Sequence, residues 1–232
     1  MITDDILKQL MPNLSEAKRV LYLPFLRSAM DEFDINTPLR AAAFLSQITY
    51  ESAELRFLEE IWGPTAWQRG YEPPGAIARQ LGNVHPGDGK RFRGRGALLI
   101  AGRANYQKYG QLLGIDLVSN PDLAASPQIA FRIACLFWNH RGFNALADQQ
   151  EIMAITKGIN AGLAGVEQRL QVYALAKRLL EAQTHGENKA TDVSMENGGE
   201  EVQKIVRRSK KSKGSDDKKT SAKDVTKKPK TK

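Results

Sequence analysis

The sequence predicts a mainly α-helical domain with long loops and at most a small β-hairpin within residues 82–96. Three observations support this prediction. Apolar residues recur at helical spacing over most of the first 185 residues, and cap residues precede several of these segments. No alternating pattern typical of an amphipathic strand continues for more than four residues.

The first two helices are expected within the first 32 residues. Residues 3–13 fit a short helix with one apolar face, and Ser15 is a candidate N-cap for a longer helix over 16–32. Pro24 lies inside this longer segment. Because proline removes a backbone donor and clashes with the preceding turn, we expect it to kink or split the helix.

A third helix begins with the pair Thr37-Pro38, in which the threonine can cap and the proline fits the first helical position. Its apolar stripe predicts that it continues to about Leu55. The next segment, 61–96, is rich in glycine, proline and aromatic residues. We therefore expect an ordered, functional loop with one short helix at 75–81.

Four further helices are expected after residue 96. Ser126 is a candidate cap for the second of them, and Gly142 and Gly158 are candidate stop signals for the second and third. The predicted helices span residues 97–112, 127–140, 150–158 and 166–181.

Positive charge is concentrated near the C-terminal end. The chain of 232 residues has a net charge of +8, and residues 186–232 hold 14 basic and 8 acidic residues, which leaves +2 for the first 185. A lysine-rich segment with few large apolar residues cannot bury enough surface to offset the entropy lost on ordering. The sequence therefore predicts one domain over 1–185 and a disordered Lys-rich tail over 186–232.

Composition also restricts compartment and cofactors. Cys135 is the one cysteine, which excludes an intramolecular disulfide. The acidic N-terminus has no leader pattern and no apolar run is long enough to span a membrane, so we expect a protein that is made in the cytoplasm without a signal peptide. We also expect a monomer. The three histidines lack metal-ligand spacing, and we predict no metal and no cofactor.

Candidate acid and base groups lie in segment 44–60, where four glutamates follow an apolar helical run. Gln47 and Glu51 are four residues apart and share a helix face with Phe44. Burial beside apolar surface would raise the pKa of Glu51 towards the range of a general acid. Glu60 follows nine residues later, and a turn between the two would let both carboxylates face one cleft. Alternatively, all four glutamates are solvated surface groups.

A cluster of basic residues follows the glutamates along the chain. Such a cluster can bind nucleic acid, or its members can pair with the glutamates. The basic residues are Lys90, Arg91, Arg93, Arg95 and Arg103.

Six segments follow one another in the order and spacing of a known family. They read ITYESAELRFLEEIWGPTAWQRGYE, GNVHPGDGKRFRGRG, AGRANYQKYG, NPDLAASPQIA, FWNHRGFNALAD and ITKGINAGLAG. Over residues 35–182 the chain resembles glycoside hydrolase family 19, and it is most similar to bacterial and phage endolysin-type members. The resemblance implies a lysozyme-like, two-lobed α-helical fold and hydrolysis of β-1,4 bonds next to N-acetylglucosamine in chitin or peptidoglycan.

The resemblance also implies site residues. The general acid of the family falls on Glu51 and the general base on Glu60, and the family inverts configuration, which requires carboxyl groups about 6.5–9.5 Å apart. Glu72 falls on a structural or substrate-contacting position, and Asn105 and Asn160 fall on amides that bind the N-acetyl sugar. The candidate substrate-binding residues are Gln47, Tyr50, Glu72, Arg95, Asn105, Tyr106 and Asn160.

The chain departs from the family pattern at several cleft positions. Tyr50 replaces a histidine before the acid, and Ala53 and Glu54 replace two glycines. Leu99 replaces a cleft amide, and Ala101 replaces a hydroxyl that helps to hold the attacking water. The loss of one such positioning bond can lower the rate about 10²-fold.

Three functions therefore stay open. The first is an active, endolysin-like hydrolase that reaches the cell wall after release from the cell. The second is an impaired relative that binds glycan or a protein partner without cleavage, which Leu99, Ala101 and Ala164 favour, the last at a position where asparagine is common. The third is a tail-mediated binder of anionic surfaces or nucleic acid, of which nucleic acid is the less expected partner. The tail could also attract the hydrolase to an anionic cell-surface polymer.

Overall fold

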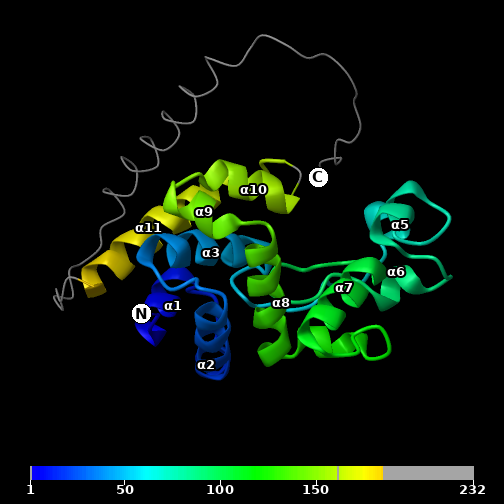
Figure 1. Cartoon of the computed structure of the whole chain (residues 1–232), viewed down its shortest axis with the longest axis horizontal. Coiled ribbons are helices and arrows are strands. Elements are labelled where there is room, and N and C mark those ends of the chain that lie inside the picture. Colours follow the sequence, from blue (N-terminus) through cyan, green and yellow to red (C-terminus); the bar gives the residue numbers. More distant parts are fainter. Residues whose placement is uncertain (1, 161, 185–232) are drawn as a thin grey trace, which may run out of the picture.

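The structure is a computed structural model that describes residues 2–160 and 162–184. Helices dominate these residues (Figure 1). In chain order they are α1 (Asp4–Leu10), α2 (Glu16–Glu32), α3 (Pro38–Glu51), α4 (Ala66–Arg69), α5 (Ala76–Leu81), α6 (Asp88–Arg91), α7 (Arg103–Leu113), the 3-10 helix η1 (Pro121–Ala125), α8 (Pro127–His140), α9 (Phe143–Asp148), α10 (Ile152–Asn160) and α11 (Val166–Thr184). The predicted tail, 186–232, and its boundary lie outside the described residues.

The prediction of a mainly α fold is confirmed. In the part of the chain that the structure describes, extended pairing is limited to two isolated antiparallel bridges, Glu59–Arg95 and Arg95–Ile100. The first bridge joins the segment before α4 to the segment before α7, and the second lies within the segment before α7. Neither bridge has both partners within 82–96, so the small hairpin that the sequence allowed there does not form among the described residues.

Local cap chemistry explains where the early helices begin. The Ser15 hydroxyl accepts a hydrogen bond from the Lys18 backbone N–H at 3.4 Å, and the Thr37 hydroxyl accepts one from the Arg40 N–H at 3.3 Å. Both helices start at the predicted residue. The expectation that Pro24 splits the helix is wrong, because α2 runs through it without interruption, and the alternative of a kink there stays a prediction. Pro24 is exposed, so water can satisfy the carbonyl that loses its donor.

The predicted end of α3 near Leu55 is wrong, because the helix stops at Glu51. The next residues leave the helical region: φ is +49° at Ala53, +66° at Glu54 and +56° at Leu55. The Glu54 N–H donates to the Thr49 carbonyl at 2.6 Å, which turns the chain back across the end of α3. This turn separates Glu51 from the segment that carries Glu60.

The predicted helix over 97–112 begins late, at Arg103. Gly102 precedes it with φ +96°, and a Cβ there would lie 2.5 Å from the Leu81 carbonyl oxygen. This close approach of backbone to α5 ends the preceding loop and fixes the direction of α7. The predicted stop at Gly158 is also wrong, since α10 continues to Asn160.

Two hydrophobic clusters give the molecule two lobes, which confirms the two-lobed, lysozyme-like prediction. In the larger cluster α11 packs along α3 and α2 packs along α8, around rings such as Phe44 and Trp138, whose centroids are 5.3 Å apart. The smaller cluster is built on Phe92, Tyr106 and Tyr109. Figure 1 shows α8 between the lobe of α1–α3 and α9–α11 and the lobe of α5–α7. Among the described residues, no helix is both long and apolar enough to cross a membrane.

Candidate active site

Glu51 ends α3 beside a buried cation. The Arg169 guanidinium of α11 is fully buried and donates from Nη2 to Glu51 Oε1. The Glu51 side chain is 16% exposed, so it borders solvent. The apolar surroundings expected for Glu51 are thus interrupted by a charged partner 118 residues away in sequence.

Gln47 holds this cation from the same face of α3. Its side chain is fully buried, and its Oε1 accepts from Arg169 Nη1 at 2.6 Å and from the Thr156 hydroxyl at 3.3 Å. Arg169 Nε donates to the Ala164 carbonyl at 3.2 Å. One helical face therefore positions the guanidinium, and the guanidinium in turn positions the Glu51 carboxylate.

Tyr50 covers the same guanidinium from the outside. Its ring centroid lies 4.2 Å from the Arg169 Cζ, a cation–π distance, and 41% of the residue is exposed. Gly165 lies against the ring, since a Cβ on Gly165 would come 2.0 Å from two ring carbons. With φ +67° as well, this position accepts only glycine without rearrangement.

The Glu60 carboxylate accepts hydrogen bonds from two donors that lie in different segments. The Gly94 N–H donates to Glu60 Oε2 at 3.0 Å, and the Gln68 side-chain amide donates to Glu60 Oε1 at 3.0 Å. Gln68 is itself fixed in α4, because it forms a capping box with Thr65 and also donates to the Ile61 carbonyl at 2.9 Å. The Glu60 carboxylate is therefore fixed in orientation.

The neighbouring Glu59 faces the basic cluster. It accepts from Arg93 at 2.5 Å and from the nearly fully buried Arg95 at 2.6 Å. Burial opposes ionisation of Glu59, but the hydrogen bonds from these two guanidinium groups outweigh it and lower the pKa of Glu59. Part of the basic cluster thus pairs with a glutamate, which is one of the two roles considered for it.

Arg95 and Tyr106 form a buried polar pair. Arg95 donates to the Tyr106 hydroxyl at 2.9 Å and to Asp122 at 2.6 Å. Burial raises the pKa of Tyr106 to about 12, against the opposing influence of Arg95. Both candidate substrate-binding residues are buried, 1% and 3% exposed; Arg95 binds Glu59 directly, and the Tyr106 hydroxyl donates to the Arg93 carbonyl at 2.7 Å.

The remaining predicted residues are spread over both lobes. Glu72 accepts from the backbone N–H groups of Gly87 and Lys90, at 2.8 and 3.2 Å, and so holds the start of α6. Asn105 donates to the Ala101 carbonyl at 2.7 Å. Asn160 Nδ2 is buried and has no hydrogen-bond partner among the residues described.

Sequence reasoning missed Arg169 and Gln68. For Arg169 a signal existed: Val166, Leu170 and Tyr173 share its face at helical spacing, so a cation stood on an apolar stripe, as Glu51 does. For Gln68 there was no comparable signal, because its role depends on the fold of the loop around it.

Comparisons with known proteins identify the family and the fold. Residues 29–155 match the family model described as chitinase class I. A protein of Haemophilus influenzae, named as containing a glycosyl hydrolase family 19 domain, is 29% identical over 158 residues, which cover 58% of this chain and 77% of that protein. Endochitinase 2 of Gossypium hirsutum is 35% identical over 102 residues, 42% of this chain.

The chain spans about a third of the length of the cotton relative, 34%. In three dimensions it is similar to chitinase C from Streptomyces griseus, with a TM-score of 0.63 and 20% identity over 78% of this chain and 92% of that structure. A structure described as a bacterial family 19 chitinase gives a TM-score of 0.60 at 22% identity, with 77% and 94% covered. At these identities the likeness shows the fold.

Proposed function

The chain belongs to the class I chitinase family, glycoside hydrolase family 19, and on this basis we propose that it hydrolyses β-1,4 bonds next to N-acetylglucosamine in peptidoglycan or chitin. The proposed mechanism is acid/base catalysis with inversion, Glu51 being the acid and Glu60 the base. The observation that carries the proposal is the anchoring of both carboxylates by buried donors, Arg169 for the first and Gln68 with Gly94 for the second.

In the proposed reaction, Glu51 donates its proton to the glycosidic oxygen as the bond from that oxygen to the anomeric carbon breaks. Glu60 removes a proton from a water molecule that attacks the anomeric carbon from the opposite face. Arg169 is placed to stabilise the negative charge that this step leaves on Glu51. The product carries the inverted configuration.

The orientation of Glu60 supports its role as base. Its two oxygens are fixed by donors from two different segments, so the carboxylate plane is set before substrate binds. Such preorganisation avoids a reorganisation cost during the reaction. Gln68 also provides a side-chain amide beside the base. Family members carry another amide elsewhere in the cleft, at the position that Leu99 occupies in this chain.

Asn160 supports an N-acetyl sugar as the substrate. A buried amide donor without a partner is unfavourable, and an acetamido carbonyl would satisfy it. We propose that Asn160 binds such a group, and that the exposed Tyr50 ring over Arg169 offers an aromatic surface to the glycan. For an enzyme of this kind, the wall of a bacterium is the proposed site of action.

One alternative has support of its own. Leu99 and Ala101 put apolar side chains where the family has polar groups, which favours a protein that binds glycan with little or no cleavage. Leu99 adopts φ +48° and lies against Gly94, the residue that binds Glu60. The two functions differ in whether Glu51 matters for turnover.

The full-length wild type, Glu51→Gln and Glu167→Gln decide between them. Turbidity loss of a peptidoglycan suspension and reducing ends from a chitin hexasaccharide would be measured. We expect the wild type to act on one of these, Glu51→Gln to lose about 10²–10⁴-fold in rate, and Glu167→Gln, an exposed glutamate of α11, to behave as wild type. Equal rates for the wild type and Glu51→Gln would contradict the catalytic proposal; binding of both to the insoluble glycan would then support the alternative.

A further inference from the structure

The turn that joins the two proposed catalytic carboxylates has an unfavourable backbone. Ala53, Glu54 and Leu55 are consecutive residues with positive φ, and none is glycine. Residues with a Cβ disfavour this left-handed region, so a run of three persists only where surrounding contacts hold it. This turn is the stretch of chain that connects Glu51, at the end of α3, to the segment that carries Glu60.

Hydrogen bonds within residues 48–57 stabilise the turn. The Ser52 hydroxyl donates to the Ile48 carbonyl at 2.5 Å and accepts from the Leu55 N–H at 2.8 Å. The Phe57 N–H donates to the Ser52 carbonyl at 3.2 Å, and the Leu55 side chain is fully buried. These bonds connect the turn to the end of α3, and none of them involves the Glu54 side chain.

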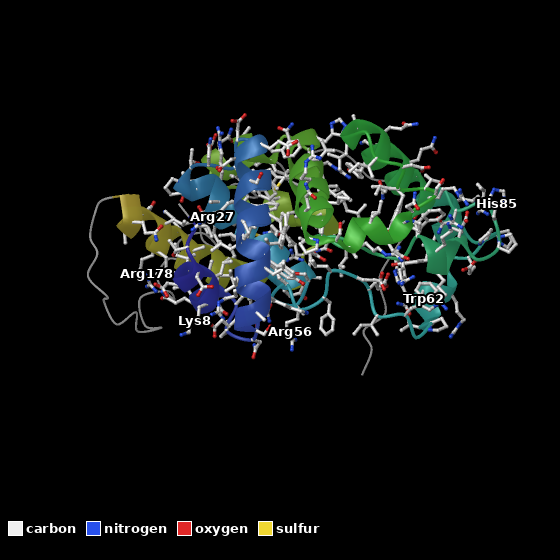
Figure 2. The ribbon with its side chains drawn as sticks, turned by 90° about the horizontal axis from the view of Figure 1, so that it is seen from below. Lys8, Arg27, Arg56, Trp62, His85 and Arg178 are labelled. Atoms are coloured by element: carbon white, nitrogen blue, oxygen red, sulfur yellow. The ribbon has the colours of Figure 1, made fainter. Side chains whose placement is uncertain are left out.

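Hydrogen bonds from the N-terminal segment also reach the turn, at the Glu54 side chain and the Arg56 carbonyl. Asn13 donates from its backbone N–H and from Nδ2 to the two carboxylate oxygens of Glu54, at 2.7 and 2.9 Å. Lys18 Nζ donates to the Arg56 carbonyl at 2.7 Å. Figure 2 shows Arg56 beside the start of α2, where these contacts are made. We call residues 13–18 the brace.

The brace is itself held in place by bonds from Arg19. Arg19, only 8% exposed, pairs with Asp4 at 2.9 Å and donates to the Leu14 carbonyl at 3.2 Å. These bonds fix α1, the loop and the start of α2 relative to one another. Donors on a fixed support can hold a neighbouring segment in one conformation at little further entropy cost.

From these contacts we propose that the N-terminal segment is part of the catalytic unit, with Asn13 and Lys18 as positioning residues that set Glu60 against Glu51 through the turn. Both residues precede the region that matches the family model, 29–155. Neither touches a candidate catalytic group, so they act through Glu54 and the Arg56 carbonyl. The effect on turnover rests on the proposed function, whereas the hold on the turn does not.

The test uses the full chain with Asn13→Ala, Glu54→Gln and Lys18→Met. Glu54→Gln is nearly isosteric but replaces one acceptor oxygen by an amide that cannot accept from Asn13. Amide exchange of residues 53–57 is expected to become about tenfold faster in each variant. For turnover of the glycan that the wild type cleaves, we expect kcat to fall about tenfold with KM nearly unchanged, since binding groups stay in place while the carboxylates are misaligned.

Lys8→Ala is the matched control, an exposed lysine on α1 that Figure 2 shows away from Arg56. It is expected to leave exchange, kcat and KM as in the wild type. Unchanged exchange in Asn13→Ala and Glu54→Gln would overturn the brace, and faster exchange with unchanged kcat would overturn its positioning role. If the wild type cleaves neither glycan, the proposed function fails, and amide exchange alone decides whether the brace holds the turn.

Discussion

At the scale of single residues, the Glu60 carboxylate depends on a neighbour that also builds the local loop. Gln68 donates to Glu60 Oε1 and to the Ile61 carbonyl, and its Oε1 accepts from the Thr65 N–H at 2.9 Å. One buried amide thus fixes both the capping box of α4 and the carboxylate proposed as the base. These two contributions can be separated by mutation.

Gln68→Met keeps the length of the side chain and removes the hydrogen bonds of the side-chain amide. We expect kcat to fall about 10-fold or more, because Glu60 loses one of the groups that orient it, and the free energy of unfolding to fall by about 1–2 kcal/mol from the lost cap. Steady-state kinetics and urea unfolding measure the two effects.

Thr65→Ala is the matched control for Gln68→Met. It removes the other half of the capping box, in which the Thr65 hydroxyl accepts from the Gln68 N–H at 3.2 Å, but keeps the Gln68 amide on Glu60. It should lower stability by about 1 kcal/mol and leave kcat near the wild-type value. If both variants lost kcat equally, the bond from Gln68 to Glu60 would have no specific role.

The sequence predicts Glu51 and Glu60 as candidates but not their partners. The two glutamates are conspicuous because a carboxylate among apolar residues needs a reason, and the resemblance gives that reason. Arg169 lies 118 residues from Glu51 and meets it only because α11 packs along α3. Such a pairing is a property of the packed structure and is not encoded in local spacing.

At the scale of elements, helix bounds that local cap chemistry sets follow from the sequence, and bounds that contacts between distant segments set do not. Ser15 and Thr37 act within three residues of themselves, so local chemistry fixes α2 and α3 at their first residues. The turn that follows α3 is contacted by Asn13 through Glu54, and the late start of α7 coincides with the close approach of Gly102 to Leu81. These contacts join segments that are far apart in the chain.

The left-handed turn after α3 gives a prediction at this scale. A left-handed conformation costs a residue with a Cβ about 1–2 kcal/mol, and glycine loses about 0.5–1 kcal/mol more entropy on folding than alanine. Ala53→Gly should therefore raise the free energy of unfolding by about 0.5–1 kcal/mol, as measured by urea unfolding.

The control is Ala145→Gly, an exposed alanine inside α9. In a right-handed helix the same substitution should lower stability by about 0.5–1 kcal/mol. If Ala53→Gly and Ala145→Gly lowered stability alike, the left-handed strain at Ala53 would be refuted.

At the scale of the whole molecule, the mainly α fold follows from the helical periodicity of the sequence and the two lobes are implied by the resemblance, whereas the four-residue helices α4 and α6 are not predicted. Long helices such as α8 carry enough apolar periodicity to be recognised. Helices α4 and α6 have four residues each and are held by side chains from elsewhere, as Glu72 holds α6. Helices this short need tertiary contacts to form at all.

The smaller lobe also gives the molecule a pH-dependent stability. Asp88 is 2% exposed and is paired with Arg103 at 2.6 Å. Burial opposes its ionisation, but hydrogen bonds from Arg103 and from the His85 and Val84 N–H groups hold the pKa of Asp88 well below its ordinary value. Because the folded state favours the carboxylate, this group stabilises the protein above pH of about 4, and the contribution is lost as pH falls further.

Asp88→Asn should therefore lower the free energy of unfolding by about 3 kcal/mol at pH 7, since it leaves Arg103 without its charged partner. The difference from the wild type should shrink as pH falls from 5 to 2. Urea unfolding at several pH values measures it. Asp31→Asn, at an exposed position of α2, should change stability by less than about 0.5 kcal/mol at every pH. A difference for Asp88→Asn that stays constant with pH would contradict the assignment.

The most direct test of the central claim, that Glu51 and Glu60 work as an inverting acid/base pair, is proton NMR of the sugar released first from a chitin hexasaccharide or a peptidoglycan fragment. The account predicts that the wild type releases the α-anomer before mutarotation and that Glu60→Gln releases product at least about 10²-fold more slowly. Release of the β-anomer, or wild-type release by Glu60→Gln, would contradict it.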